Sequence, residues 1–134
     1  MFFVHSCLQG TIYTVTSNLD TNASGTLRYA LLNASSGDTI NFGISSQTIT
    51  IGSNGITTAL PYLQGVAING GSGNTVSGNG AYPIFFVMGG TNTITNLTLT
   101  GGYAKGGSGG LGAGGGGGGL GAGGALFLSP GVSV

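Results

Sequence analysis

The chain has 134 residues, of which 3% are charged and 31 are glycine, and its net charge is zero. It therefore offers neither the basic surface that binds nucleic acid nor a polybasic segment for an anionic membrane. Ordinary domains contain about 25% charged residues, so solubility here must come from Thr, Ser, Asn and backbone groups. The length indicates one domain, and the 40% share of hydrophobic residues argues against simple disorder.

Residues 1–10 are predicted to be an irregular leader. They begin with apolar residues but contain no Lys or Arg and no clear cleavage site, which makes a poor secretory signal. No apolar run in the chain reaches the length of a membrane-spanning helix. The single cysteine, Cys7, cannot form an internal disulfide, and His5 has no second ligand at a metal-binding spacing.

A strand is predicted over residues 11–16, T-I-Y-T-V-T, and a polar loop follows over 17–24. The next stretch is the only one with helical spacing. One face of that helix is formed by Leu27, Ala30, Leu31 and Ala34. Thr26 is the expected N-cap, and Gly37 is expected to end the helix because glycine tolerates positive φ.

This helix is too short to persist alone in water, so it needs an apolar surface to lie on. The open end of a stack of β-strands is such a surface, because its unpaired edge must be covered. We therefore expect residues 11–42 to form an N-terminal cap in which the helix acts as a lid. The alternative is an ordinary short helix on the flank of a β-sandwich.

Short strands separated by Gly, Asn and Ser turns make up the rest of the pattern. They are predicted at 38–42, 48–51, 66–69, 74–77, 84–88, 93–95, 96–100, 125–128 and 132–134. Many short strands with no helices between them indicate either a β-sandwich or a β-solenoid.

Pairs of apolar residues separated by one residue favour the solenoid, because both members of a pair point into a shared core. The pairs are Ile49 and Ile51, Val66 and Ile68, Phe85 and Val87, Leu97 and Leu99, Leu126 and Leu128, and Val132 and Val134. Asn is expected to form ladders at the corners. The gaps between pairs are irregular, which favours a sandwich or a solenoid with loops of variable length. The sequence predicts an all-β, right-handed parallel β-helix whose rungs occupy residues 43–100.

The helix and the strand after it also resemble a known family. G-T-L-R-Y-A-L-L-N-A followed by G-D-T-I-N-F is similar to the N-terminal cap of bacterial secreted β-helix proteins, the autotransporter-passenger and polymorphic outer-membrane-protein-like adhesins. L-P-Y-L-Q-G-V-A-I-N-G and I-T-N-L-T-L-T-G-G resemble their rungs. The resemblance implies a secreted or cell-surface protein that binds an unknown surface receptor or glycan.

Few residues could carry out catalysis. Besides five tyrosines, the titratable residues are His5, Cys7, Asp20, Arg28, Asp38 and Lys105. Carbohydrate-active β-helices need paired carboxylates or a calcium-binding cluster, and only Asp20 and Asp38 are available. Asp38 is expected to accept backbone N–H groups in a turn, and Arg28 to be a helix-surface cation near either aspartate. We therefore predict no catalytic, cofactor-binding or metal-binding residue, and a non-enzymatic protein.

The segment 101–124 is rich in glycine and includes six consecutive glycines at 114–119. It lacks the G-K-[ST] of a phosphate-binding loop. We expect a flexible surface loop inserted between rungs, or else a compact glycine-rich lobe of the kind found in phage adhesins. Residues 125–134 are expected to start a further rung, which either continues beyond residue 134 or associates with another copy.

T-x-T triplets occur at 14–16, 48–50, 93–95 and 98–100. Regular ranks of threonine on a flat face can bind ice, but this spacing is irregular and outward threonines are expected on any β-helix. The sequence thus predicts the structural or adhesive N-terminal part of a surface-displayed β-helix protein. The alternatives are a phage-type glycine-rich adhesin, an ice-binding solenoid and a degenerate carbohydrate-active β-helix.

Overall fold

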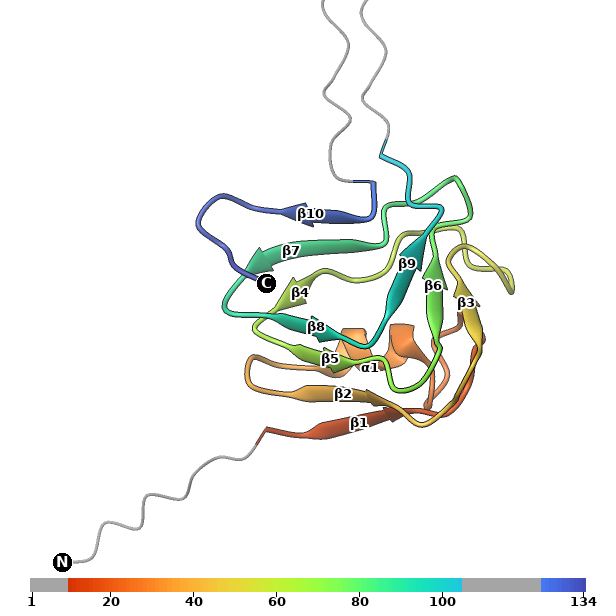
Figure 1. Cartoon of the computed structure of the whole chain (residues 1–134), viewed down its shortest axis with the longest axis horizontal. Helices are drawn as coiled ribbons and strands as arrows, with labels where there is room; N and C mark the ends of the chain where they lie inside the picture. The colour runs from red at the N-terminus through yellow and green to blue at the C-terminus, as the bar shows by residue number, and fades with distance from the viewer. Residues whose placement is uncertain (1–9, 105–123) are drawn as a thin grey trace, which may run out of the picture.

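The computed structural model describes residues 10–104 and 124–134, and it is a β-solenoid of about three turns with one short helix (Figure 1). The predicted all-β parallel solenoid is therefore confirmed, while the handedness of its coil stays a prediction. The leader up to residue 9 and most of the glycine-rich segment, residues 105–123, lie outside the described residues.

Three parallel sheets form the sides of the coil. Sheet 1 contains β1 (Ile12–Val15), β2 (Thr39–Phe42), β5 (Ala67–Asn69) and β8 (Thr93–Thr95). Sheet 2 contains β3 (Thr48–Thr50), β6 (Thr75–Ser77) and β9 (Thr98–Thr100). Sheet 3 contains β4 (Leu63–Gln64), β7 (Phe85–Gly89) and β10 (Leu126–Leu128). Each complete coil contributes one strand to each sheet.

The register stacks apolar residues above one another inside the coil. In sheet 2, Ile49 pairs with Val76 and Val76 pairs with Leu99. Among the predicted apolar pairs, the buried ones are Ile49 and Ile51, Val66 and Ile68, and Phe85 and Val87. The later pairs are less enclosed than predicted, because Leu128 and Val134 are 43% and 48% exposed. The strand predicted at 132–134 is also wrong, since only a single bridge joins Ser133 to Thr91.

The helix α1 (Leu27–Asn33) begins as the sequence predicts. The Thr26 hydroxyl accepts a hydrogen bond from the backbone N–H of Tyr29 at 3.1 Å, which confirms the N-cap. Leu27, Ala30 and Leu31 are buried in the core, so the predicted apolar face is also confirmed.

The predicted end of the helix at Gly37 is wrong. The helix ends at Asn33, and Ala34 is the C-cap in an extended conformation. Gly37 adopts its positive φ of 94° three residues later, in the turn that leads into β2. The conformational freedom of glycine is therefore needed by the β-turn and not by the helix.

In the first coil, α1 occupies the position that a strand of sheet 3 occupies in later coils, because it follows β1 and precedes β2. It packs against β1, and residues of α1 and of β4, the edge strand of sheet 3, line one groove. Figure 1 shows α1 in the half of the stack nearer to β1. The helix therefore covers part of the apolar core at the start of the solenoid. Within the described residues no helix is long and apolar enough to cross a membrane.

Buried asparagines hold the corners of the coil. Asn74 is 1% exposed, accepts from the backbone N–H of Gln47 and donates to the carbonyls of Ile44 and Gly70. It thereby satisfies backbone groups of the preceding coil, at Ile44 and Gln47, and of its own corner, at Gly70. Asn92 has the same role one coil later, accepting from Val66. The predicted asparagine ladder is represented by the exposed contact from Asn96 to Asn69 at 3.1 Å.

Candidate functional site

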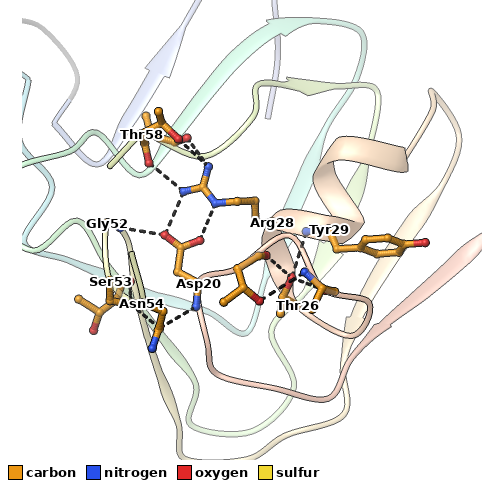
Figure 2. A network of polar contacts seen from close by, with 12 residues as sticks. Asp20, Thr26, Arg28, Tyr29, Gly52, Ser53, Asn54 and Thr58 are labelled. Carbon is orange, nitrogen blue, oxygen red and sulfur yellow. Dashed lines mark hydrogen bonds and ion pairs between the residues drawn. The ribbon is translucent and has the colours of Figure 1, made fainter. Parts of the chain in front are cut away.

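The described part of the chain contains one ion pair, between Arg28 on α1 and Asp20 in the loop before the helix (Figure 2). The Arg28 Nε and Nη2 atoms donate to the two carboxylate oxygens of Asp20 at 2.6 and 2.9 Å. The remaining guanidinium hydrogens bond to Thr58 and to the carbonyl of Ala59. Arg28 was expected to lie near Asp20 or Asp38, and the structure pairs it with Asp20.

The expectation that Arg28 lies on the helix surface is wrong. The side chains of Arg28 and Asp20 are only 5% and 0% exposed. Five hydrogen bonds engage the guanidinium, which has five N–H donors, and Asp20 also accepts from the backbone N–H of Gly52 at 2.8 Å. Because both side chains are buried and every guanidinium N–H is engaged, this pair joins α1 to the loops around it.

The second carboxylate is equally committed to backbone contacts. The two oxygens of Asp38 accept from the backbone N–H groups of Thr11 and Ser35, both at 2.7 Å. The predicted turn role of Asp38 is confirmed, and the contact ties the start of β1 to the segment after α1. The residues His5, Cys7 and Lys105 lie outside the described residues. Within residues 10–104 and 124–134, no three His, Cys, Asp or Glu side chains are grouped as metal ligands would be.

The described surface of the solenoid is uncharged. Asp20, Arg28 and Asp38 are the only charged residues of the described ranges, and they are 1%, 4% and 7% exposed. Any ligand of this surface would meet hydroxyls, amides, backbone groups and apolar side chains.

The outer face of sheet 2 carries two columns of hydroxyl side chains. Their register aligns Thr48, Thr75 and Thr98 in one column and Thr50, Ser77 and Thr100 in the other. Neighbouring strands in a sheet lie about 4.8 Å apart, and side chains two residues apart on one face lie about 6.6 Å apart. We call these six residues the threonine face.

The threonine face corrects the expectation of irregular spacing. The triplets at 48–50 and 98–100 share this face, whereas 93–95 belongs to sheet 1. The coil between them contributes Thr75 and Ser77, which sequence reasoning missed because T-V-S does not match T-x-T. Treating serine and threonine as equivalent would have revealed the middle rank.

A groove of about 500 Å³ lies between α1 and β4. It is lined by Leu31, Leu32, Ala34, Ser35, Ser36, Pro61, Tyr62, Gln64 and Val66. We call it the helix–β4 groove. No charged side chain lines it, and its walls combine apolar surface with hydroxyl and amide groups.

Comparison of the chain with protein-family models, with curated proteins and with solved structures gave no match. The resemblance to bacterial β-helix adhesins therefore depends on the sequence motifs alone. Functional conclusions must come from the geometry of the surfaces described above.

Proposed function

We propose that the chain is a non-enzymatic adhesive module of a secreted or surface-displayed β-solenoid protein, and that its ligand is an uncharged glycan. The observation that supports this most is that the outer surface of residues 10–104 and 124–134 is uncharged and carries polar side chains that repeat in register from coil to coil. The likeness of the cap motif to that of secreted adhesins supports the location outside the cell.

The chemistry of the surface suits a neutral polysaccharide. Hydroxyl and amide side chains both donate and accept hydrogen bonds, as sugar hydroxyls do. Each such contact contributes only about 0.5–1.5 kcal/mol net, so one contact would hold a ligand weakly. A repeated surface compensates because several weak contacts to one polymer act together.

A solid-phase binding assay tests this proposal. The labelled chain is applied to immobilised neutral polysaccharides and to heparin as a charged control. We expect retention on at least one neutral polymer, unchanged when the salt rises to about 1 M, where the screening length falls to roughly 3 Å. Absence of binding to every neutral polymer, or retention that salt abolishes, would contradict the proposal.

The threonine face supports ice binding as a second candidate function. Its six hydroxyl side chains form an uncharged array that repeats in two directions, along the strands and from coil to coil. In-register ranks are the feature that separates this candidate from a β-helix with scattered threonines. The array has three ranks, so we expect inhibition of ice recrystallisation to be a more sensitive measure than a change in freezing point.

Two variants with the same substitution in the same coil test the second candidate. Thr98→Lys places a long charged side chain on the threonine face, whereas Thr93→Lys places it on sheet 1. Both residues are exposed, so neither change disturbs the core. If ice binds to the threonine face, the Thr98→Lys variant no longer inhibits ice recrystallisation, whereas the Thr93→Lys variant still does. Equal behaviour of the two variants, or no inhibition by the unmodified chain, would exclude it.

A further inference from the structure

The helix–β4 groove is a recess of the described surface with room for a small ligand. Its volume of about 500 Å³ falls within the range of about 300–1,000 Å³ that is usual for small-molecule sites. We infer that this groove holds one sugar ring of a neutral glycan, with the ring stacked on Tyr62. The inference rests on the proposed adhesive function and names where the ligand binds.

The apolar part of the groove fits the C–H face of a pyranose ring. Leu31 and Val66 are 6% and 3% exposed and provide apolar surface that is fixed in the core. Tyr62 and Leu32 are 58% and 56% exposed, so their side chains stand open at the groove. Large apolar side chains exposed together are costly in water, and covering them with a ligand recovers part of that cost.

The polar part of the groove matches the hydroxyl groups of the same ring. Ser35, Ser36 and Gln64 line the groove and are exposed. A hydroxyl or a primary amide both donates and accepts, as the alternating hydroxyls of a sugar require. The groove has no charged lining residue to attract a phosphate, a carboxylate or a cation, so a neutral polyol fits better than an ionic ligand.

The two walls of the groove are fixed to each other before any ligand binds. Arg28 joins α1 to Thr58 and Ala59, which lie just before the β4 wall in the chain. On the other side of the groove, the backbone N–H of Gly37 donates to the carbonyl of Gly65 at 2.8 Å. A preformed site binds more tightly because little motion is lost on binding. The buried ion pair thus has a second consequence, which is to set the width of the groove.

The shape of the groove also requires a glycine at position 65. A side chain at this position would overlap the hydroxyl of Ser36, and its φ of 68° disfavours other residues. The close approach of Ser36 to the β4 segment therefore depends on glycine. It keeps a polar group of the helix side next to Gln64 on the strand side.

Titration with soluble neutral trisaccharides of glucose, galactose and mannose tests the groove, with affinity measured by calorimetry and the binding site mapped by amide NMR shifts. We expect shifts at Ser36, Tyr62 and Gln64, and about a tenfold loss of affinity in Tyr62→Ala. Tyr62→Phe keeps the ring and should retain most of the affinity. Tyr103→Ala is the matched control, because Tyr103 is 46% exposed but does not line the groove.

The outcomes separate the groove from the adhesive function as a whole. Binding of a trisaccharide that Tyr62→Ala and Gln64→Ala both leave unchanged would overturn the groove while the adhesive function stands. Shifts confined to the threonine face would overturn it in the same way. If no trisaccharide binds but an immobilised polymer is retained, the groove inference is also wrong. Failure of both assays would overturn the two proposals together.

Discussion

At the scale of single residues, the few charged side chains of this protein are used for structure. Arg28 and Asp20 are buried and engage each other through two hydrogen bonds. Removing charges from water costs several kcal/mol per ion, and only complete pairing and hydrogen bonding repays it. Arg28 meets this condition, since all its guanidinium N–H groups have acceptors, on Asp20, Thr58 and Ala59. The pair therefore specifies how the first coil closes.

We expect Arg28→Met to lower the free energy of unfolding by about 3–5 kcal/mol, because it leaves the Asp20 carboxylate buried without its partner. Urea unfolding followed by circular dichroism measures this loss. The double variant Asp20→Asn with Arg28→Met removes both charges and should be less destabilised than the single variant. A single-variant loss below about 1 kcal/mol would mean that water reaches the pair.

The sequence narrowed the partner of Arg28 to two aspartates but predicted neither the choice of Asp20 nor the burial of the pair. The eight-residue separation of Asp20 and Arg28 includes a loop whose path no local pattern specifies. Burial of the pair depends on Thr58 and Ala59, more than 25 residues further along the chain. The hydroxyls of Thr75 and Ser77 were missed for the same reason. Their place in the threonine face is defined only by the strands paired on either side.

At the scale of elements, the helix is stable because of what it covers. Seven residues are too few for an independent helix, and its stability must come from the N-cap and from burial of its apolar face. That face is set by spacing of three and four residues, which sequence reasoning detects well. The end of the helix was mispredicted because Gly37 is required by the following turn. The strand β4 was not predicted, because its two residues are too few to give a periodic signal.

Adjacent leucines on α1 provide a matched test of the lid. We expect Leu31→Asp to lower the free energy of unfolding by about 3 kcal/mol or more, since the residue is 6% exposed and a carboxylate there would be buried without a partner. Leu32→Asp makes the same change at a residue that is 56% exposed and should cost little. Thermal melts compare the two variants. Equal midpoints would show that α1 does not cover the core.

The stems of the glycine-rich segment already lie together in the coil. The backbone of Gly102 contacts that of Gly124 so closely that a side chain at Gly102 would collide with it. The backbone N–H of Tyr103 donates to the carbonyl of Tyr82, and the backbone N–H of Phe85 donates to the carbonyl of Ala125. The two ends of the segment, Gly102 and Gly124, therefore lie side by side.

Replacing residues 105–123 by a short glycine–serine turn should consequently leave the solenoid folded. Closing a shorter loop costs no more entropy than closing a longer one when the stems are already adjacent. We expect an unchanged β-signal in circular dichroism and a thermal midpoint within a few degrees. Loss of the β-signal would show that the replaced residues are part of the packed body.

At the scale of the whole molecule, the fold class followed from the sequence but the register did not. Thr48 pairs with Thr75 and Thr75 with Thr98, offsets of 27 and 23 residues, while Phe85 pairs with Leu126, an offset of 41. Loops of different length at the corners produce these differences without changing the stack. Apolar pairs in short strands therefore predicted a solenoid, whereas the ranks of the threonine face became visible only when the coils were aligned.

Several large apolar side chains are exposed at the β10 end of the stack. Phe86 and Phe127 stack on the outer face of sheet 3 with ring centroids 4.5 Å apart. Met88 on the same face is 48% exposed, and Leu128, which pairs with the buried Val87 on the inner face, is 43% exposed at the open edge. Among the described strands, β10 pairs only with β7, so its other edge presents unpaired backbone groups. No exposed charge on the described surface opposes contact with a second copy.

We therefore expect the 134-residue chain to associate through the β10 edge in a concentration-dependent way, because pairing this edge covers both backbone groups and apolar side chains. Static light scattering over a dilution series measures the molecular mass. Leu128→Lys adds a charge at the edge and should shift the chain towards the monomer. Leu19→Lys is the control, since Leu19 is 47% exposed and lies before α1 in the first coil, away from β10. A mass equal to that of the monomer at every concentration, or equal effects of the two lysine variants, would show that this edge is not an association surface.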